Sequence, residues 1–453
     1  MSELKDFDIN EFKIGQNLYI EASAGTGKTY TIELLVKKML QNNIPLSKIL
    51  IVTFTDKAAG ELRDRIRKKI ISCLENDSYN SIFTTALQEV GNAQIFTFHS
   101  FCQNVLNNFA YETKSSLNLE LVNDNNIEDI VDRFIRDKWQ KISDFKKLLC
   151  FSDFKLDDLK SECINAVKQY NLFTDLKIEE IDIKKDDKKL FEDKFVLTHF
   201  HELIDEWQNY KKNNNLISFA DMINLVHENV CKNNSILVDR LREAYRYAII
   251  DEFQDTNQKQ WDIFGKIFLD GKNNNIIVVG DPKQSIFSFQ GAEIDVYKKA
   301  IDKIGNGRRL SSNYRSSDAM IKACNEIFNG KKDNFFGTNS GIELCDSIFP
   351  VHNEDSDKKT ASLNGRIVEP IWLAKPSDGL EYAKYAVSKM VECLKCDENG
   401  KTALQIYDKN ENQMRSVKFS DFAVLARTRS EMPFIENEMR NIGIPFYRYK
   451  DTS

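Results

Sequence analysis

The chain has 453 residues, 42% of them hydrophobic, which is enough for about three domains with separate cores. Residues 1–12 are acidic where a signal peptide is basic and then apolar, and no stretch approaches the roughly 20 apolar residues of a membrane span. Nine cysteines are scattered without the dense spacing of a secreted framework, so we expect a cytoplasmic protein without membrane association. The net charge of −6 predicts no general attraction to nucleic acid, but proteins of this kind can bind nucleic acid through local basic stripes, so charge alone does not decide the partner.

A phosphate-binding loop follows the first apolar run, residues 18–20. The sequence ASAGTGKT comes next, and apolar residues at helical spacing follow it, which predicts a strand, a loop and a helix. Glycines in the loop let backbone N–H groups close on phosphates, the lysine can reach the β and γ phosphates, and the last threonine offers a hydroxyl to Mg2+. The residues predicted to bind a nucleoside triphosphate are Ala22, Ser23, Ala24, Gly25, Thr26, Gly27, Lys28 and Thr29.

Further apolar runs predict strands of a mostly parallel sheet at residues 49–54, 94–98, 247–250 and 276–279. Ligands bind beyond the carboxyl ends of such strands, so the polar residues that follow them should converge on the loop around Lys28. Residues 111–216 are long, charged segments that indicate an inserted helical subdomain. A second α/β region begins near residue 310, with candidate strands at 367–373, 422–425 and 444–447.

Two adjacent carboxylates end the strand at 247–250. We expect Asp251 to hold Mg2+ through water and Glu252 to act as the general base that polarises the attacking water. A buried strand can end in Asp-Glu by chance, but here Phe-Gln-Asp-Thr follows it. After the next strand, Gln284 can hydrogen-bond the γ phosphate or the water. Later, Arg315 is a planar cation suited to a triphosphate, and Tyr314 can stack on a base.

Two other strand ends combine aromatic and hydroxyl side chains, a surface that binds single-stranded nucleic acid. The first holds Thr53, Phe54 and Thr55, before a helix with five cations between residues 63 and 69. The second holds Thr97 and His99. Core packing is the alternative for each aromatic side chain taken alone.

Taken in order, ASAGTGKT, VTFTDKAAGELRDRI, TFHSFC, DEFQDT, GDPKQSIFSFQGA and NYRSS resemble the motifs of superfamily 1 DNA helicases of the UvrD and RecB group. EASAGTGKT and the Pro-Lys of GDPKQ are similar to the RecB branch, the β subunits of exodeoxyribonuclease V, and the AddA branch remains an alternative. The resemblance implies P-loop, RecA-like motor domains of α/β class with ATP between them. It divides the chain into motor domain 1A at residues 1–110 and 217–309, helical insertion 1B at 111–216, and part of motor domain 2A at 310–453.

The resemblance also implies roles for matching residues. Those for ATP hydrolysis are Lys28, Thr29, Asp251, Glu252, Gln284 and Arg315, with Tyr314 on the adenine. Those on the DNA track are Phe54, His99, Phe287 and Phe289. Two residues depart from the pattern: Ala22 stands in place of the first glycine of the phosphate loop, and Gln290 stands where many relatives have Arg.

We therefore expect the ATPase motor of a RecB-like 3′ to 5′ DNA helicase, acting in double-strand break repair and recombination, with ATP and Mg2+ as cofactors. Its expected partners are single-stranded and duplex-end DNA and, in a longer parent protein, RecC- and RecD-like subunits. We expect the chain to stop within the second motor domain, and exonuclease V activity only in such a parent. The alternatives are an AddA- or UvrD-like helicase, or a non-catalytic module that binds ATP, DNA or partner subunits.

Overall fold

The structure is a computed structural model that describes residues 4–76, 81–113, 115, 119–150, 154–169, 188–285, 294–329, 349–350, 361–368, 371–372, 374–375, 377–408 and 411–448. The chain forms two compact units. The first comprises Met1–Ala22 and Lys28–Arg309, and the second comprises Ser23–Gly27 and Leu310–Ser453. No described helix is both long and apolar enough to cross a membrane.

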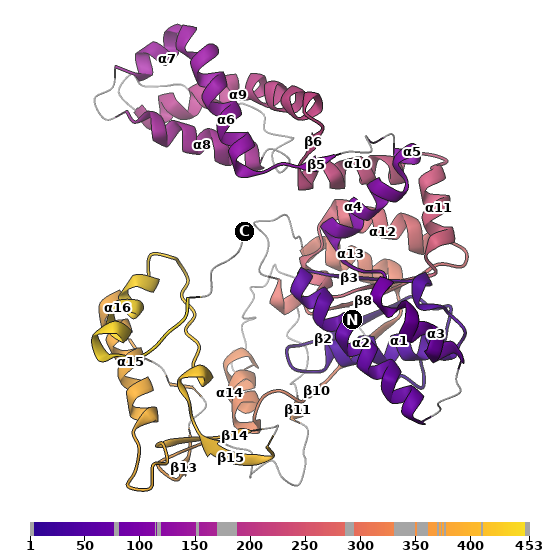
Figure 1. Ribbon diagram of the computed structural model, residues 1–453, viewed down its shortest axis with the longest axis vertical. Coiled ribbons are helices and arrows are strands. Elements are labelled where there is room, and N and C mark those ends of the chain that lie inside the picture. The colour runs from indigo at the N-terminus through magenta and orange to yellow at the C-terminus, as the bar shows by residue number, and fades with distance from the viewer. Residues whose placement is uncertain are drawn as a thin grey trace. The chain divides into compact units, whose positions relative to one another are not determined.

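A seven-stranded sheet organises the first unit (Figure 1). In spatial order its strands are β1 (Lys5–Asp6), β9 (Gly307–Leu310), β2 (Leu18–Ala22), β8 (Asn275–Gly280), β7 (Tyr247–Ile250), β3 (Ile49–Thr53) and β4 (Ile95–Thr97). The pairs β1–β9, β2–β8, β8–β7, β7–β3 and β3–β4 are parallel. The predicted α/β class is confirmed, and all five strands predicted for this part of the chain are present.

Helices cover both faces of this sheet (Figure 1). One face carries α1 (Lys28–Gln41), α2 (Asp56–Asn76) and α3 (Ser81–Glu89). The other carries α4 (Phe98–Asn108), α10 (Phe219–Cys231), α11 (Ile236–Ala244), α12 (Gln258–Phe264), a π-helical turn at Gly265–Leu269, and α13 (Ile294–Ile304). Because helices cover both faces of the sheet, the strands are continuous apolar runs and do not alternate between apolar and polar residues.

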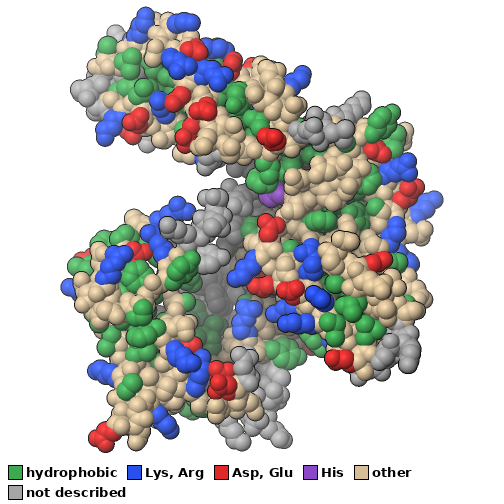
Figure 2. All heavy atoms as spheres, viewed as in Figure 1, with side chains coloured by type: hydrophobic (Ala, Val, Ile, Leu, Met, Phe, Trp, Pro, Cys, Tyr) green, Lys and Arg blue, Asp and Glu red, His purple; other side chains and the backbone are tan. Residues whose placement is uncertain are grey.

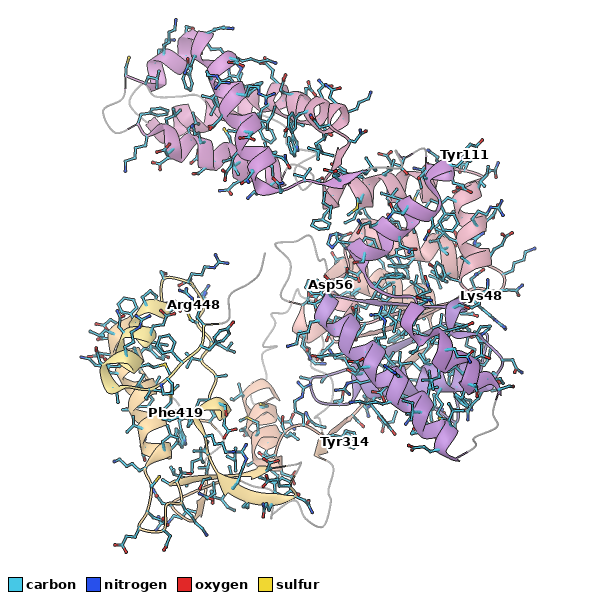
Figure 3. All side chains as sticks on the ribbon, in the orientation of Figure 1. Lys48, Asp56, Tyr111, Tyr314, Phe419 and Arg448 are labelled. Atoms are coloured by element: carbon cyan, nitrogen blue, oxygen red, sulfur yellow. The ribbon has the colours of Figure 1, made fainter. Side chains whose placement is uncertain are left out.

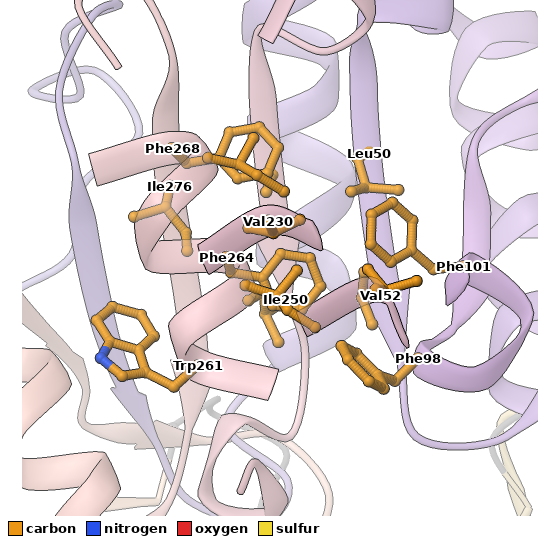
Figure 4. Close-up of a cluster of buried hydrophobic side chains, with 14 of the residues drawn as sticks. Leu50, Val52, Phe98, Phe101, Val230, Ile250, Trp261, Phe264, Phe268 and Ile276 are labelled. Carbon is orange, nitrogen blue, oxygen red and sulfur yellow. The ribbon is translucent and has the colours of Figure 1, made fainter. Parts of the chain in front are cut away.

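The core on the second face is built from alternate strand residues and helix aromatics (Figure 4). Leu50 and Val52 lie in this cluster with Phe101 and Phe264, whereas Ile51, between them in sequence, is also fully buried and points to the opposite face. Each fully buried side chain of this size contributes roughly 1.5 to 3 kcal/mol relative to an exposed one. The core therefore fixes the strand ends, where the candidate site lies.

The segment between α4 and α10 is helical, as predicted. It contains α5 (Ala110–Thr113), α6 (Asp124–Asp137), α7 (Ser143–Leu148), α8 (Leu156–Gln169) and α9 (Lys188–Asn213), with the short parallel pair β5 (Glu120–Leu121) and β6 (Leu216–Ile217). Helices α6 to α9 have a core of their own around Phe134, Trp139 and Trp207. Their outer surface carries charges of both signs (Figure 2). The domain boundaries that we predict remain predictions.

The second unit contains a short parallel pair, β10 (Ser312–Asn313) with β11 (Phe349–Pro350), and the helices α14 (Asp318–Asn329), α15 (Gly379–Leu394) and α16 (Met432–Ile442). It also contains an antiparallel sheet in the order β13 (Arg366–Ile367), β12 (Ser362–Leu363), β14 (Leu404–Asp408) and β15 (Gln413–Ser416).

Two strands predicted for this unit are wrong. Within residues 411–448 no strand follows β15, so the apolar runs at 422–425 and 444–447 are not strands. Phe422, Val424 and Ile444 instead pack against Val387 of α15 and Met439 of α16. These apolar side chains are buried against helices and do not belong to a sheet. Among the described residues of the predicted strand 367–373, Ile367 lies in a strand and residues 368, 371 and 372 do not, while residues 369, 370 and 373 lie outside the described part of the chain.

Candidate functional site

The phosphate loop lies between β2 and α1, as predicted. Gly25 and Gly27 have φ of +81° and +95°, the left-handed region that glycine adopts without strain. The Thr26 hydroxyl donates a hydrogen bond of 2.7 Å to the carbonyl oxygen of Ser23, which closes the turn. Helix α1 begins at Lys28, directly after the loop. Its first N–H groups have no partner within the helix, an arrangement that favours a phosphate.

The predicted lysine and base meet at the carboxyl ends of β2 and β7. Lys28 Nζ donates to Glu252 Oε2 at 2.5 Å, and Gln254 Nε2 donates to the same oxygen at 2.8 Å. The Lys28 side chain is only 12% exposed. Glu252 has φ of +50°, a conformation that is strained for a residue with a side chain. The chain therefore holds this carboxylate in place at an energetic cost.

Asp251 has an unusual ionisation. Burial, and then repulsion from Glu252, raise the pKa of Asp251 to about 6, although Lys28 opposes the shift. Lys28 does not fully offset burial and the Glu252 charge, and a carboxylate whose charge is not fully compensated fits a divalent cation. Mg2+ commonly takes one or two carboxylates together with waters and phosphate oxygens, so it needs no cage of protein ligands. Among the described residues no group of three or more His, Cys, Asp or Glu could form such a cage. Asp251 and Thr29, in the first turn of α1, are the residues that fit this role.

Asp255 belongs to the same carboxylate group, although we did not predict it. It ends the short 3-10 turn Phe253–Asp255 that follows Glu252. Burial and the charge of Glu252 raise the pKa of Asp255 to about 6 as well. Its Oδ1 is buried and has no hydrogen-bond partner among the described residues. Three carboxyl groups, those of Asp251, Glu252 and Asp255, therefore lie near the single positive charge of Lys28.

The end of β8 is tied to the carboxylates through Gln254 and Asp281, which we also did not predict. The backbone N–H of Asp281 donates to Gln254 Oε1 at 2.9 Å. The side chain of Gln284 donates to Asp281 Oδ2 at 2.7 Å. Lys283 Nζ lies 2.9 Å from Glu21 Oε1 and 3.1 Å from Asp281 Oδ1. Glu21 and Lys283 belong to the sequence features that are similar to the RecB branch.

In the second unit, the NYR segment contacts the phosphate loop. Asn313 Nδ2 donates to the carbonyl of Ala24 at 2.8 Å, and the backbone N–H of Tyr314 donates to the carbonyl of Gly25, also at 2.8 Å. A Cβ atom on Gly25 would lie 2.7 Å from Arg315 Cβ, so only glycine fits there. Tyr314 is 65% exposed (Figure 3). The sequence indicated Tyr314 and Arg315 but not Asn313, which makes the anchoring contact.

The predicted DNA-contacting hydroxyl groups make local hydrogen bonds. Thr53 is buried and donates to the carbonyl of Thr55 at 3.1 Å. Thr55 accepts from the N–H of Ala58 at the start of α2, and Thr97 is the N-cap of α4 and accepts from the N–H of Ser100 at 3.2 Å. Their contact with DNA remains a prediction.

Phe54 and His99 lie at these strand ends, as expected. Phe54 is 40% exposed and lies two residues before Asp56, the first residue of α2 (Figure 3). The His99 ring packs edge-on against Phe219, with ring centroids 4.7 Å apart. Burial lowers the pKa of His99, and the nearby Asp56 carboxylate opposes this. Phe219 is 51% exposed and was not predicted. Phe287, Phe289 and Gln290 lie outside the described residues.

Three of the five cations between residues 63 and 69 of α2 make contacts within the protein. Arg63 donates to the carbonyl of Ile95 at 3.1 Å, Arg65 lies 3.6 Å from Glu33, and Lys69 Nζ lies over the Tyr30 ring at 5.0 Å from its centroid. At about 1.5 Å of rise per residue, Lys69 is roughly 20 Å along the axis from the helix start. Arg67 and Lys68 are exposed, and contact of the α2 cations with DNA stays a prediction.

Comparison with known proteins places these sites in a family. Residues 8–305 match the UvrD/REP helicase N-terminal domain, and residues 308–453 match the UvrD-like helicase C-terminal domain. The chain is 27% identical to the RecBCD enzyme subunit RecB of Haemophilus influenzae, over 95% of this chain and 49% of that protein. It is 23% identical to an ATP-dependent helicase/nuclease subunit from Lactobacillus gasseri, over 96% and 48%, and 26% identical to a probable DNA helicase II homolog of Mycoplasma capricolum, over 96% and 50%. The chain spans about half the length of these curated relatives. The predicted resemblance is confirmed: the chain belongs to the UvrD/REP helicase family.

Proposed function

We propose that this chain is the ATP-driven motor region of a RecB-like DNA helicase that moves 3′ to 5′ on single-stranded DNA. One observation carries the proposal: Lys28, from the phosphate loop, lies 2.5 Å from Glu252, which follows a strand more than 200 residues later in the chain. A lysine that can bind phosphates and a carboxylate that can accept a proton from water are the two groups that hydrolysis of a triphosphate needs side by side.

In this proposal the residues of the site have separate tasks. The loop N–H groups and Lys28 bind the phosphates, and Glu252 accepts the proton of the attacking water. Gln284 orients the water or the γ phosphate, and Arg315 offsets the charge that develops during transfer. Thr29 and Asp251 would hold Mg2+, which would supply further positive charge at the phosphate oxygens. Tyr314 stacks on the adenine.

We propose that single-stranded DNA binds by stacking on exposed aromatic side chains. Phe54 and Phe219 are exposed in the described part of the chain, and His99 packs against Phe219. Phe287 and Phe289 complete this track in the proposal. Each stacked base is worth roughly 1 to 3 kcal/mol.

The names of the relatives support the biological assignment that we propose. Several of them are called subunits of the RecBCD enzyme, which favours a role in double-strand break repair beside RecC- and RecD-like partners. The similarity to the helicase/nuclease of Lactobacillus gasseri keeps an AddA-like assembly as a second candidate. We also propose the division of the chain into motor domain 1A, insertion 1B and part of motor domain 2A at the boundaries given above.

The test is the DNA-stimulated ATPase rate of Lys28→Ala. Removing the cation that contacts the phosphates should lower turnover at least about a hundredfold, because phosphoryl transfer depends on positioned charge. Lys38→Ala, at the other end of α1, is the matched control and should retain the wild-type rate. Near wild-type turnover in Lys28→Ala would overturn the proposal. Unwinding of a duplex with a 3′ overhang, but not of one with a 5′ overhang, tests the direction of movement.

A further inference from the structure

We propose that Gln254 is a positioning residue that orients the Glu252 carboxylate and couples it to the end of strand β8, where Gln284 lies. The inference rests on the proposed function, because it assigns a task to Gln254 within that ATPase site. It is carried by a chain of hydrogen bonds from Glu252 through Gln254 and Asp281 to Gln284.

Both polar atoms of the Gln254 side chain are engaged. The residue is 2% exposed, so its amide depends on protein partners. Nε2 donates to Glu252 Oε2 at 2.8 Å, and Oε1 accepts from the N–H of Asp281 at 2.9 Å. Turning the amide over would place a donor against the N–H of Asp281 and an acceptor against the carboxylate. The orientation of the side chain is therefore fixed by its partners at both ends.

Glu252 needs such support because its own backbone does not favour the observed position. Its φ is +50°, and its side chain remains 33% exposed. Among the described residues, Lys28 and Gln254 both donate to Oε2. The other oxygen, Oε1, is therefore the one available to a water. If Lys28 turns towards bound phosphates, the bond from Gln254 still holds the carboxylate.

The opposite end of the chain of bonds reaches Gln284. Asp281 is 2% exposed, and its carboxylate accepts from Gln284 Nε2 at 2.7 Å. A Cβ atom on Gly280 would lie 2.8 Å from Gln254 Oε1, so the end of β8 packs directly against this amide. The buried Gln254 side chain contacts both Asp281 and Glu252. A movement of Gln284 that shifts Asp281 would therefore also shift the Glu252 carboxylate.

Two substitutions of Gln254 separate its contacts. Gln254→Met has similar length and removes both hydrogen bonds. Gln254→Glu retains an oxygen for the N–H of Asp281 but removes the donor to Glu252. The matched control is Gln258→Met, because Gln258 is exposed on α12 and its side chain bonds only to Asp262 among the described residues. Lys28→Ala is measured in parallel.

The readouts are kcat and KM of the ATPase with oligo-dT, the Kd of a fluorescent ATP analogue, and the melting temperature. Misplacing a catalytic group by about 1 Å can cost on the order of a hundredfold, so we expect both Gln254 variants to lose roughly ten- to a hundredfold in kcat. KM and analogue Kd should stay within about threefold of wild type, because the phosphate-binding groups are unchanged. Gln258→Met should behave as wild type.

The other outcomes overturn the inference in distinguishable ways. If both Gln254 variants retain kcat while Lys28→Ala is inactive, Gln254 has no positioning role and the proposed function stands. Loss in Gln254→Met alone would assign the effect to the Asp281 contact and overturn the link to Glu252. A loss of nucleotide binding or melting temperature that matches the loss of kcat would indicate a merely structural residue. If Lys28→Ala turns over as fast as wild type, the proposed function fails and the inference fails with it.

Discussion

Replacing Asp251 by asparagine should stabilise the nucleotide-free protein while it abolishes turnover. The Asp251 carboxylate is desolvated and lies beside Glu252, so its charge opposes folding when no cation is bound. Its Oδ1 accepts a 2.9 Å hydrogen bond from the N–H of Glu252, and an asparagine oxygen can accept the same bond. The substitution therefore removes the charge with little change in shape.

The size of the effect follows from the shifted ionisation. Burial raises the pKa of Asp251 from an ordinary value of 3.8 to about 6. At about 1.4 kcal/mol per pKa unit, the charged form costs up to about 3 kcal/mol in the folded protein relative to the unfolded chain. Because the residue is partly exposed and its titration is linked to that of Glu252, we expect a gain of about 1 to 3 kcal/mol for Asp251→Asn.

Because the pKa of Asp251 is raised in the folded protein, the stability of the wild type depends on pH in a distinctive way. Between about pH 4 and pH 6 the folded protein still holds a proton that the unfolded chain has released. Stability of the wild type should therefore fall as pH rises through this window and stay lowered above it. The advantage of Asp251→Asn should be full at pH 7.5 and absent near pH 4.

Urea unfolding in EDTA, without nucleotide, measures the difference. Asp64→Asn on the exposed side of α2 is the control, and it should show no such pH-dependent gain. A wild-type protein that is at least as stable as Asp251→Asn at pH 7.5 would refute the reasoning. So would a gain of the same size at pH 4.

Two further predictions concern other parts of the chain. Phe54→Ala should weaken binding of oligo-dT by roughly 1 to 3 kcal/mol, because one stacked base is lost. Tyr111→Ala, at a residue 92% exposed on α5, should leave binding unchanged. Fluorescence anisotropy with labelled oligo-dT measures the affinity of both variants. Asp421→Asn should destabilise the second unit near neutral pH, because the Arg415 guanidinium holds the pKa of Asp421 at about 2. That loss should shrink as pH falls below 4 towards 2, where the wild-type carboxylate also becomes neutral, and a pH series of melting temperatures would contradict the assignment if the loss were constant.

The strands of the first unit could be predicted because their burial on both faces makes them continuous apolar runs. The same criterion failed in the second unit. Phe422, Val424 and Ile444, from the four-residue runs at 422–425 and 444–447, pack against helices, and periodicity cannot separate a strand from such a segment at that length. The hairpin of β14 and β15 was missed because its residues are only partly buried or exposed and mix polar with apolar side chains.

At the candidate site, the motifs predicted the charged residues. They did not predict the polar residues that position those charged groups and the phosphate loop. Gln254 and Asn313 act on neighbouring groups through backbone and carboxylate contacts, and motif spacing does not reveal such partners. Thr97 shows the converse. Its hydroxyl was predicted to lie on the DNA track, and its role as the cap of α4 was not predicted, although a threonine directly before a helix is a recognised capping signal. The contact of Thr97 with DNA stays a prediction, as do those of Phe54 and His99.

The raised pKa of Asp251 means that its charge is unfavourable in the empty site. We expect bound Mg2+ to offset that charge. A ligand that binds only the folded protein stabilises it by about 2.7 kcal/mol at a hundred times its Kd. This is close to the 1 to 3 kcal/mol, in order of magnitude, that we assign to the uncompensated Asp251 charge. Saturating Mg2+ and ATP analogue should therefore stabilise the wild type more than Asp251→Asn, and narrow or reverse the order of stability measured in EDTA. Equal stabilisation of both proteins would mean that Asp251 does not hold the metal, whatever its charge costs the empty site.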